Sequence, residues 1–137
     1  MAKGHTLADV LAEHGRWLLG EADAARAQLD HMRFGSMDLS GRDLRDISLR
    51  EADLSGCNLS GANLEAANLS GANLRGADLT NTNLQDTDIS NTDLREAIFD
   101  GTNLRGADAW RSNLLGAVIS PEALHKLMGC VLPGRQK

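Results

Sequence analysis

The stretch from residue 52 to residue 79 repeats nearly the same five residues: ADLSGCNLSGANLEAANLSGANLRGADL. A period of five fits neither an α-helix, which repeats every 3.6 residues, nor a β-strand, which alternates every two. Central residues spaced by five, counted from Leu54, continue without a slip from Ala24 to Ile119, and all except Ala24 and Ala109 are large and apolar. A register kept over twenty pentads predicts a solenoid of stacked repeats.

Each pentad has the same internal order. The residue two before the centre is small in most pentads, Asp or Asn directly precedes 15 of the 20 centres, and the two residues after the centre are mostly polar or glycine. Alternate residues of an extended chain point to one side, so the small residue and the centre are expected to face inward. The Asp and Asn side chains are expected to stabilise the corners by bonding to nearby backbone, which argues against a catalytic role for them. Four early pentads depart from the pattern because Met32, Met37, Arg42 and Ile47 replace the small residue, and at Arg42 we expect local distortion or a carboxylate partner.

The pattern A(D/N)LxG, seen in ANLSG at 67–71, ANLRG at 72–76 and ADLTN at 77–81, resembles the pentapeptide-repeat family. The resemblance covers about residues 22–121. It implies a right-handed quadrilateral β-helix with four pentads to a coil, and therefore about five coils.

We expect three segments: a capping helix in residues 1–21, the β-helix in 22–121, and a C-terminal helix and tail in 122–137. Thr6 and Asp9 form a capping-box pattern, and an apolar stripe with Trp17 beside it follows on one helical face: Leu7, Val10, Leu11, His14 and Leu18. His14 is expected to be a packed cap residue.

The C-terminal helix is expected to begin at Pro121 and to end before Pro133-Gly134. Its apolar stripe is Leu124, Leu127, Met128 and Val131. This stripe either caps the last coil or joins two chains into a homodimer, a role that C-terminal elements often have in the family.

Composition excludes several classes of function. The net charge is −5, which disfavours a direct nucleic-acid binder that depends on a basic surface. Cys57 and Cys130 are too few for a disulfide framework or a zinc site, and Cys57 occupies an inward small-residue slot. No membrane segment, secretion signal, phosphate-binding loop or dinucleotide fingerprint is evident. We therefore expect a cytoplasmic protein that is not an enzyme and needs no metal or cofactor.

Acidic residues are concentrated in the later pentads, where Arg95 is the only basic residue among them: Asp78, Asp86, Asp88, Asp93, Glu96 and Asp100. Quinolone-resistance members of the family resemble a DNA duplex in width and charge. That resemblance makes DNA mimicry the leading hypothesis. The acidic rod would occupy the basic DNA-binding groove of a type II topoisomerase, or of a host defence nuclease complex if the protein comes from a phage.

The alternative is a passive scaffold that binds a partner protein without mimicking DNA. Ile98, Trp110 and Leu115 are apolar at positions that are normally polar and face outward. We expect the C-terminal helix to cover Ile98 and Leu115. Trp110 and Arg111 are then the predicted partner-binding residues, because Trp and Arg dominate the energetics of protein interfaces.

Overall fold

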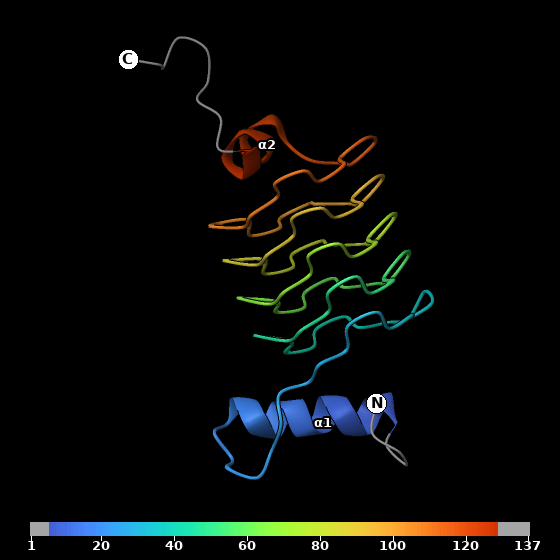
Figure 1. Cartoon of the computed structure of the whole chain (residues 1–137). Helices are drawn as coiled ribbons and strands as arrows, with labels where there is room; N and C mark the ends of the chain where they lie inside the picture. The colour runs from blue at the N-terminus through green and yellow to red at the C-terminus, as the bar shows by residue number, and fades with distance from the viewer. Residues whose placement is uncertain (1–5, 129–137) are drawn as a thin grey trace.

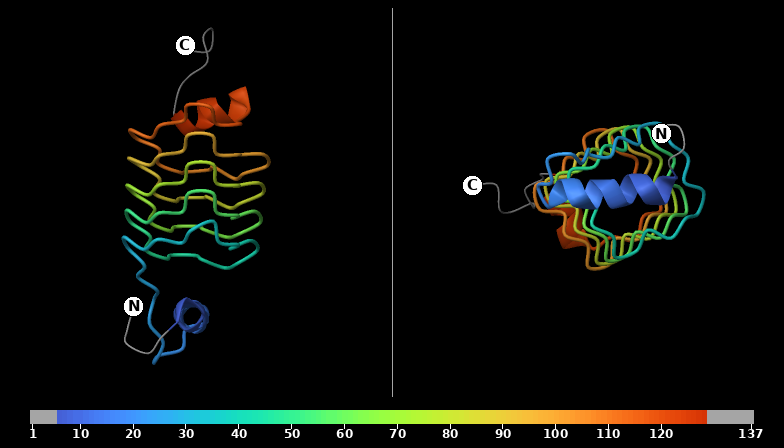
Figure 2. Two further views of the ribbon diagram at one scale, coloured as in Figure 1. Left: turned by 90° about the vertical axis from the view of Figure 1, so that its right-hand side faces the viewer. Right: turned by 90° about the horizontal axis from the view of Figure 1, so that it is seen from below.

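The computed structural model describes residues 6–128. In it, a stack of coils rises between two helices, α1 (Leu7–Leu18) at the N-terminal end and α2 (Pro121–Met128) at the C-terminal end (Figure 1). Viewed along the stack, the coils overlie one another as a closed tube, and α1 lies across its opening (Figure 2). Neither helix of the described chain is both long enough and apolar enough to cross a bilayer.

The coils are in register at an interval of twenty residues. Parallel bridges join residues twenty apart, from Gln28 with Ser48 through to Ile98 with Val118, and each falls at the position before a pentad centre. Four pentads therefore complete one turn, as the resemblance implied. Each face contributes isolated bridges rather than a strand of several residues. The pentad predicted around Ala24 precedes the first bridge, because the chain makes a turn there after α1.

One pentad shows how the backbone is satisfied. Asn58 donates to the carbonyl of Met37 in the coil before (3.1 Å), and Leu59 donates to Asp78 in the coil after (2.9 Å). The amide of Gly61 at the corner donates to Thr80 (2.9 Å). A pentad pairs its backbone N–H and C=O groups only when it stacks on the coils before and after it. Each coil therefore depends on its neighbours.

The pentad centres fill the tube. In the middle coils they are fully buried, with 0% exposure at Leu54, Leu59, Leu64, Leu69, Leu74, Leu79, Leu84, Ile89 and Leu94. Cys57 is also at 0%, as predicted for an inward slot. Later coils place Thr in this slot, and the buried hydroxyl of Thr87 donates to the carbonyl of Leu64 (2.7 Å).

The first coil is irregular in the way the sequence suggested, and at Arg42 the structure shows a local departure from the inward direction, the first of the two outcomes expected there. Ile47 is buried and Met32 packs against the core, whereas Met37 is 38% exposed. Arg42 is exposed instead of pointing inward. Turning the guanidinium into water avoids the cost of burying its charge.

The corners of the tube have left-handed backbone at the second residue after every centre from Leu29 to Leu114 except Phe34, where Gly35 takes this conformation instead. This φ is +70° at Gly76 and +60° at Ala66. Gly76→Ala is expected to lower the free energy of unfolding by about 1–2 kcal/mol from conformation alone, because no neighbouring atom lies within 4 Å of an added Cβ. Ala66→Gly, the matched exchange, is expected to raise it by about 0.5–1 kcal/mol. Urea unfolding measures the stability of both variants. A loss of stability in Ala66→Gly would contradict the left-handed conformation at residue 66.

Helix α1 is built as its sequence predicted. The Thr6 hydroxyl accepts the amide of Asp9 (3.1 Å), and the Asp9 carboxylate accepts the amide of Thr6 (3.0 Å), which completes the capping box. Leu7, Val10 and Leu11 pack against the core of the tube. The helix therefore closes the N-terminal opening of the apolar interior, which an end coil alone would leave exposed.

Candidate binding surface

The outward Asp and Asn side chains mainly hold the corners of the coils. The Oδ1 atom of Asn58 accepts both the backbone amide (3.0 Å) and the hydroxyl (2.7 Å) of Ser60. The bond from the backbone amide two residues later recurs in most pentads. On one face the side-chain amides form a ladder. The Nδ2 atom of Asn83 donates to Oδ1 of Asn63 (3.1 Å), and the Nδ2 atom of Asn103 donates to Oδ1 of Asn83 (3.2 Å). These groups are used by the fold, as the sequence predicted.

The six acidic residues of the sequence prediction surround the tube. Asp78, Asp88 and Asp93 form bridges in three different columns of the stack, so they lie on three different faces. A segment of about twenty residues necessarily circles the axis once in this fold. The acidic group is therefore a ring around the tube and not a stripe along it.

The charge of this ring is partly compensated. Arg95 lowers the pKa of Asp93 and pairs with it, since its guanidinium donates to both carboxylate oxygens (2.9 and 2.7 Å). The pKa of Asp78 is lowered by a hydrogen bond from the Thr80 hydroxyl (2.6 Å), which keeps this carboxylate charged.

Glu96 receives a hydrogen bond from Arg75 (3.0 Å) in the coil below. Asp86 and Asp100 are exposed at corners and form no ion pair within the described chain. The net negative field of the ring therefore comes mainly from these two residues together with Asp78 and Asp88, because none of the four is in an ion pair within the described chain.

Exposed apolar side chains gather on the last coil. Trp110 is 62% exposed, Leu115 75% and Val118 52%. The guanidinium of Arg111 stacks on the Trp110 ring, 4.4 Å from its centre, which holds the aromatic side chain in place. We call Trp110, Arg111, Leu115 and Val118 the C-terminal patch.

The expectation that α2 covers Ile98 and Leu115 was wrong for Leu115. Ile98 is half-buried and pairs with Val118 across the last two coils, but Leu115 points into water. The reason is that α2 packs over Leu104 and Ala109 instead.

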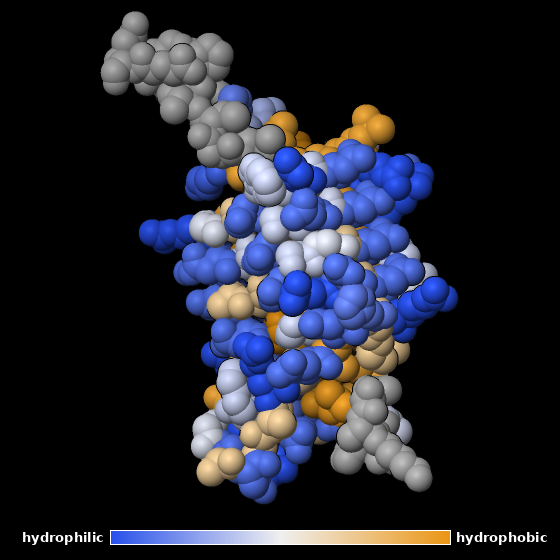
Figure 3. Space-filling view, in the orientation of Figure 1, coloured by the Kyte–Doolittle hydropathy of each residue, from blue (hydrophilic) through white to orange (hydrophobic). Residues whose placement is uncertain are grey.

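Helix α2 caps only part of the C-terminal end. Beneath it Leu104 and Ala109 are 5% and 8% exposed, and Leu127 is buried against them at 6%. Leu114 and Ile119 on the other two faces are only half-buried. Figure 3 shows apolar surface at this end, on the side away from α2. Leu124 is half-buried, while the side chain of Met128 and all of Val131 lie outside the described residues.

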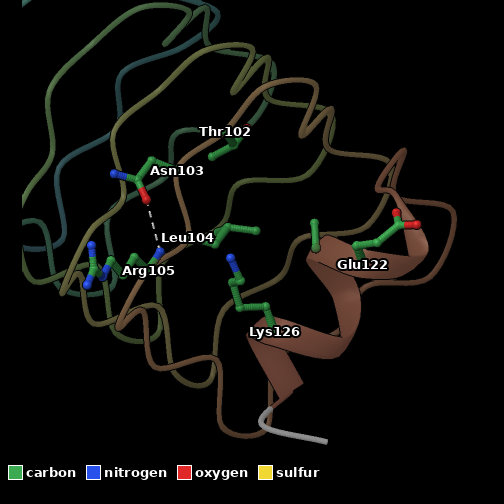
Figure 4. Close-up of a pocket in the computed structure, with 7 residues that line it drawn as sticks. Thr102, Asn103, Leu104, Arg105, Glu122 and Lys126 are labelled. Atoms are coloured by element: carbon green, nitrogen blue, oxygen red, sulfur yellow. Dashed lines mark hydrogen bonds between the residues drawn. The ribbon is translucent and has the colours of Figure 1, made fainter. Parts of the chain in front are cut away.

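A hollow of about 290 Å³ separates α2 from the last coil (Figure 4). The Lys126 side chain extends from α2 toward Leu104, whereas the Glu122 carboxylate points away from Leu104 (Figure 4). A second hollow of about 350 Å³ lies beside Trp110 and Leu127. Neither hollow joins a nucleophile to a base, and in the described chain no three His, Cys, Asp or Glu side chains are placed to share a metal ion.

Cys57 is expected to be unreactive in the native protein. Burial raises the pKa of its thiol, and the thiolate is the reactive form. In a Cys130→Ser variant, reaction with an aromatic disulfide at pH 8 should be at least about tenfold slower before unfolding in urea than after it. Equal rates would place Cys57 at the surface.

The repeat is shared with known proteins. The family model for pentapeptide repeats matches in eight copies, over residues 38–71, 57–95 and 97–120. These segments make up more than half of the chain. The chain therefore belongs to the pentapeptide-repeat family, and its fold is the β-helix of that family.

Solved structures with the same repeat include HetL, which is involved in heterocyst differentiation regulation in the cyanobacterium Nostoc (37% identity, TM-score 0.48, 75% of this chain and 44% of that one). A thylakoid-lumen protein of Arabidopsis thaliana is 32% identical (TM-score 0.43, 64% of this chain and 57% of that one). A trypsin-treated form of QnrB1, a plasmid-mediated fluoroquinolone resistance protein, is 16% identical (TM-score 0.28, 67% and 72%). The chain spans about half the length of the first two, and a comparison with curated protein sequences returned no match.

Proposed function

We propose that this protein is a non-catalytic binding protein that holds a partner protein at the C-terminal end of its β-helix. One observation carries the proposal: three of the five large hydrophobic side chains exposed in the described chain lie on the last coil. Exposed apolar groups beside polar ones are typical of interaction sites. A rigid solenoid presents them with little loss of conformational entropy on binding.

The centre of this interaction is Trp110 with Arg111. The stacked pair offers an aromatic surface and a guanidinium whose donors remain available to a carboxylate of the partner. The hollow beside Trp110 and Leu127 gives an apolar side chain of the partner a place to insert. The partner surface that fits this end is therefore an apolar one with a carboxylate at its edge.

Trp110→Ala with Arg111→Ala is expected to weaken partner binding by at least about 2 kcal/mol, close to thirtyfold, without changing the thermal midpoint. The variant and the unaltered protein are each used to capture proteins from a lysate of the source organism, and retained proteins are identified by mass spectrometry. The control is Asp86→Asn with Asp100→Asn, which leaves the C-terminal patch intact. A partner retained equally by all three proteins would contradict the proposal.

A homodimer is the second use proposed for this end. Helix α2 covers two faces of the last coil and leaves the other two open. If two chains meet at their C-terminal ends across a two-fold axis, the α2 helix of each chain would cover the two open faces of the other chain. Sedimentation of the full chain tests it: a dimer that dissociates in Leu115→Asp supports this arrangement, and a monomer at all concentrations rejects it.

DNA mimicry is the second candidate function, favoured by the excess of acid, 19 acidic against 14 basic residues. It predicts that binding to a basic groove weakens steeply with salt, and that Asp86→Lys with Asp100→Lys abolishes it. These two carboxylates are better targets than Asp93 or Glu96, whose reversal would also break an arginine pair. Binding that resists both salt and the reversal would remove this candidate, and with it a topoisomerase or nuclease groove as the partner.

A further inference from the structure

His14 lies at the junction of α1 with the first coil and is completely buried. Its ring stacks on Trp17, with 5.5 Å between the centres and 21° between the planes. Both ring nitrogens bond to backbone of the coil side: Nε2 lies 2.7 Å from the carbonyl oxygen of Arg45, and Nδ1 lies 3.0 Å from the amide nitrogen of Ala27. One side chain of the cap is thus tied to two separate segments of the β-helix.

The two partners fix the protonation of the ring. The amide of Ala27 is a donor, so Nδ1 must present its lone pair. The carbonyl of Arg45 is an acceptor, so Nε2 must carry the hydrogen. His14 is therefore bound as the neutral Nε2–H tautomer, and the closed cap has no acceptor for a second ring proton.

The charges around His14 do not change this conclusion. On the coil side Asp43 and Arg45 approach the ring, but the Asp43 carboxylate is held at two points by Arg45 (2.8 and 2.7 Å). On the helix side Arg16 is paired with Glu21 and Asp23. Asp43, Glu21 and Asp23 are therefore each paired with an arginine.

We propose that His14 is a pH-sensitive latch that holds α1 on the end of the β-helix and releases it when the ring is protonated. A proton on Nδ1 would face the Ala27 N–H, break that bond, and leave a charge in a buried site. The closed cap offers this proton no acceptor, whereas a released helix would expose the ring to water, so lower pH is expected to favour release. Release uncovers the apolar end of the tube around Leu29 and Phe34.

Amide hydrogen exchange of the full chain tests the latch. Between about pH 7 and pH 5, where imidazole ordinarily titrates, the protection factors of Ala27 and of the α1 amides should fall by up to about tenfold per pH unit. The amide of Leu64 in a middle coil should keep its protection factor. Constant protection of α1 down to pH 5 would overturn the proposal.

Two variants separate the latch from general acid effects. His14→Gln cannot titrate and should show α1 protection that no longer depends on pH, whereas His31→Gln, which alters an exposed histidine beside Glu51, should behave as the unaltered protein does. Retained pH dependence in His14→Gln would overturn the proposal.

If α1 does not dock in His14→Gln, the proposal is tested instead by the ¹⁵N chemical shifts of the His14 ring in the unaltered protein. They should report the neutral Nε2–H form at pH 7.5. The Nδ1–H form would contradict the latch.

Discussion

Leu74→Ala is expected to lower the free energy of unfolding by about 3–5 kcal/mol. Leu74 is completely buried between coils, and its neighbours in the stack, Leu54 and Leu94, are equally buried. The cavity left by the missing carbons cannot collapse easily, because the backbone around it is tied to the coils above and below. Each repeat is stabilised by its neighbours, so a defect in a middle coil weakens the interfaces on both sides.

The matched control is Leu114→Ala, because Leu114 occupies the same position of the pentad in the same column, two coils later. Leu114 is only half-buried, so its truncation should cost roughly 1–2 kcal/mol. Urea unfolding followed by circular dichroism measures both. Equal losses would mean that the end of the tube is as well covered as its middle.

Deletion of residues 69–73 is expected to leave a folded, shorter β-helix. It removes one whole pentad and joins Asn68 to Leu74, which restores the pattern ANLRG. Every later pentad moves to the neighbouring face of the tube, because one pentad makes up one face. The central residues still point inside, but they stack on different residues of the coil before. The hydrogen bond from Asn83 to Asn63 is broken, because these two residues then lie on different faces. The bond from Asn103 to Asn83 is kept, since both residues follow the deletion.

Deletion of Ser70 alone is expected to be far more damaging, although it removes fewer atoms. It shortens one corner, so the following residues no longer alternate in phase with the coils above and below. About three backbone hydrogen bonds are broken, at about 1 kcal/mol each, in addition to the damage to core packing. If the single deletion were tolerated as well as the deletion of the pentad, the five-residue unit would not control the fold.

The sequence predicted the body of this fold well because its pattern is redundant. A central Leu, a small residue two positions before it and a preceding Asx all indicate the same geometry, so agreement among them is informative. The family was identified from the same pattern. Thr6 with Asp9, and Pro121, marked the start of each helix for equally local reasons.

The parts that could not be predicted depend on long-range geometry. Arg42 occupies an inward slot by count, but the first coil has no coil before it to enforce the inward direction, and the side chain reaches water. The incomplete cover of the last coil depends on the direction of α2, which no local pattern specifies.

For the candidate sites, sequence counting located the acidic residues and Trp110. It did not show that the acids form a ring or that Arg75 reaches Glu96, because that pair joins residues one coil apart. The two bonds of His14 were also beyond the sequence. They join α1 to Ala27 and Arg45, which come together only once the cap has docked.

The most direct test of this account is a nuclear Overhauser spectrum of the isotope-labelled protein. If pentads stack four to a coil, backbone protons of Asn58 and Asp78, of Asn63 and Asn83, and of Asn68 and Asp88 must be in close contact. We expect contacts between residues twenty apart along all four faces. Contacts at separations of three and four throughout residues 28–118, or at any other constant interval, would contradict it.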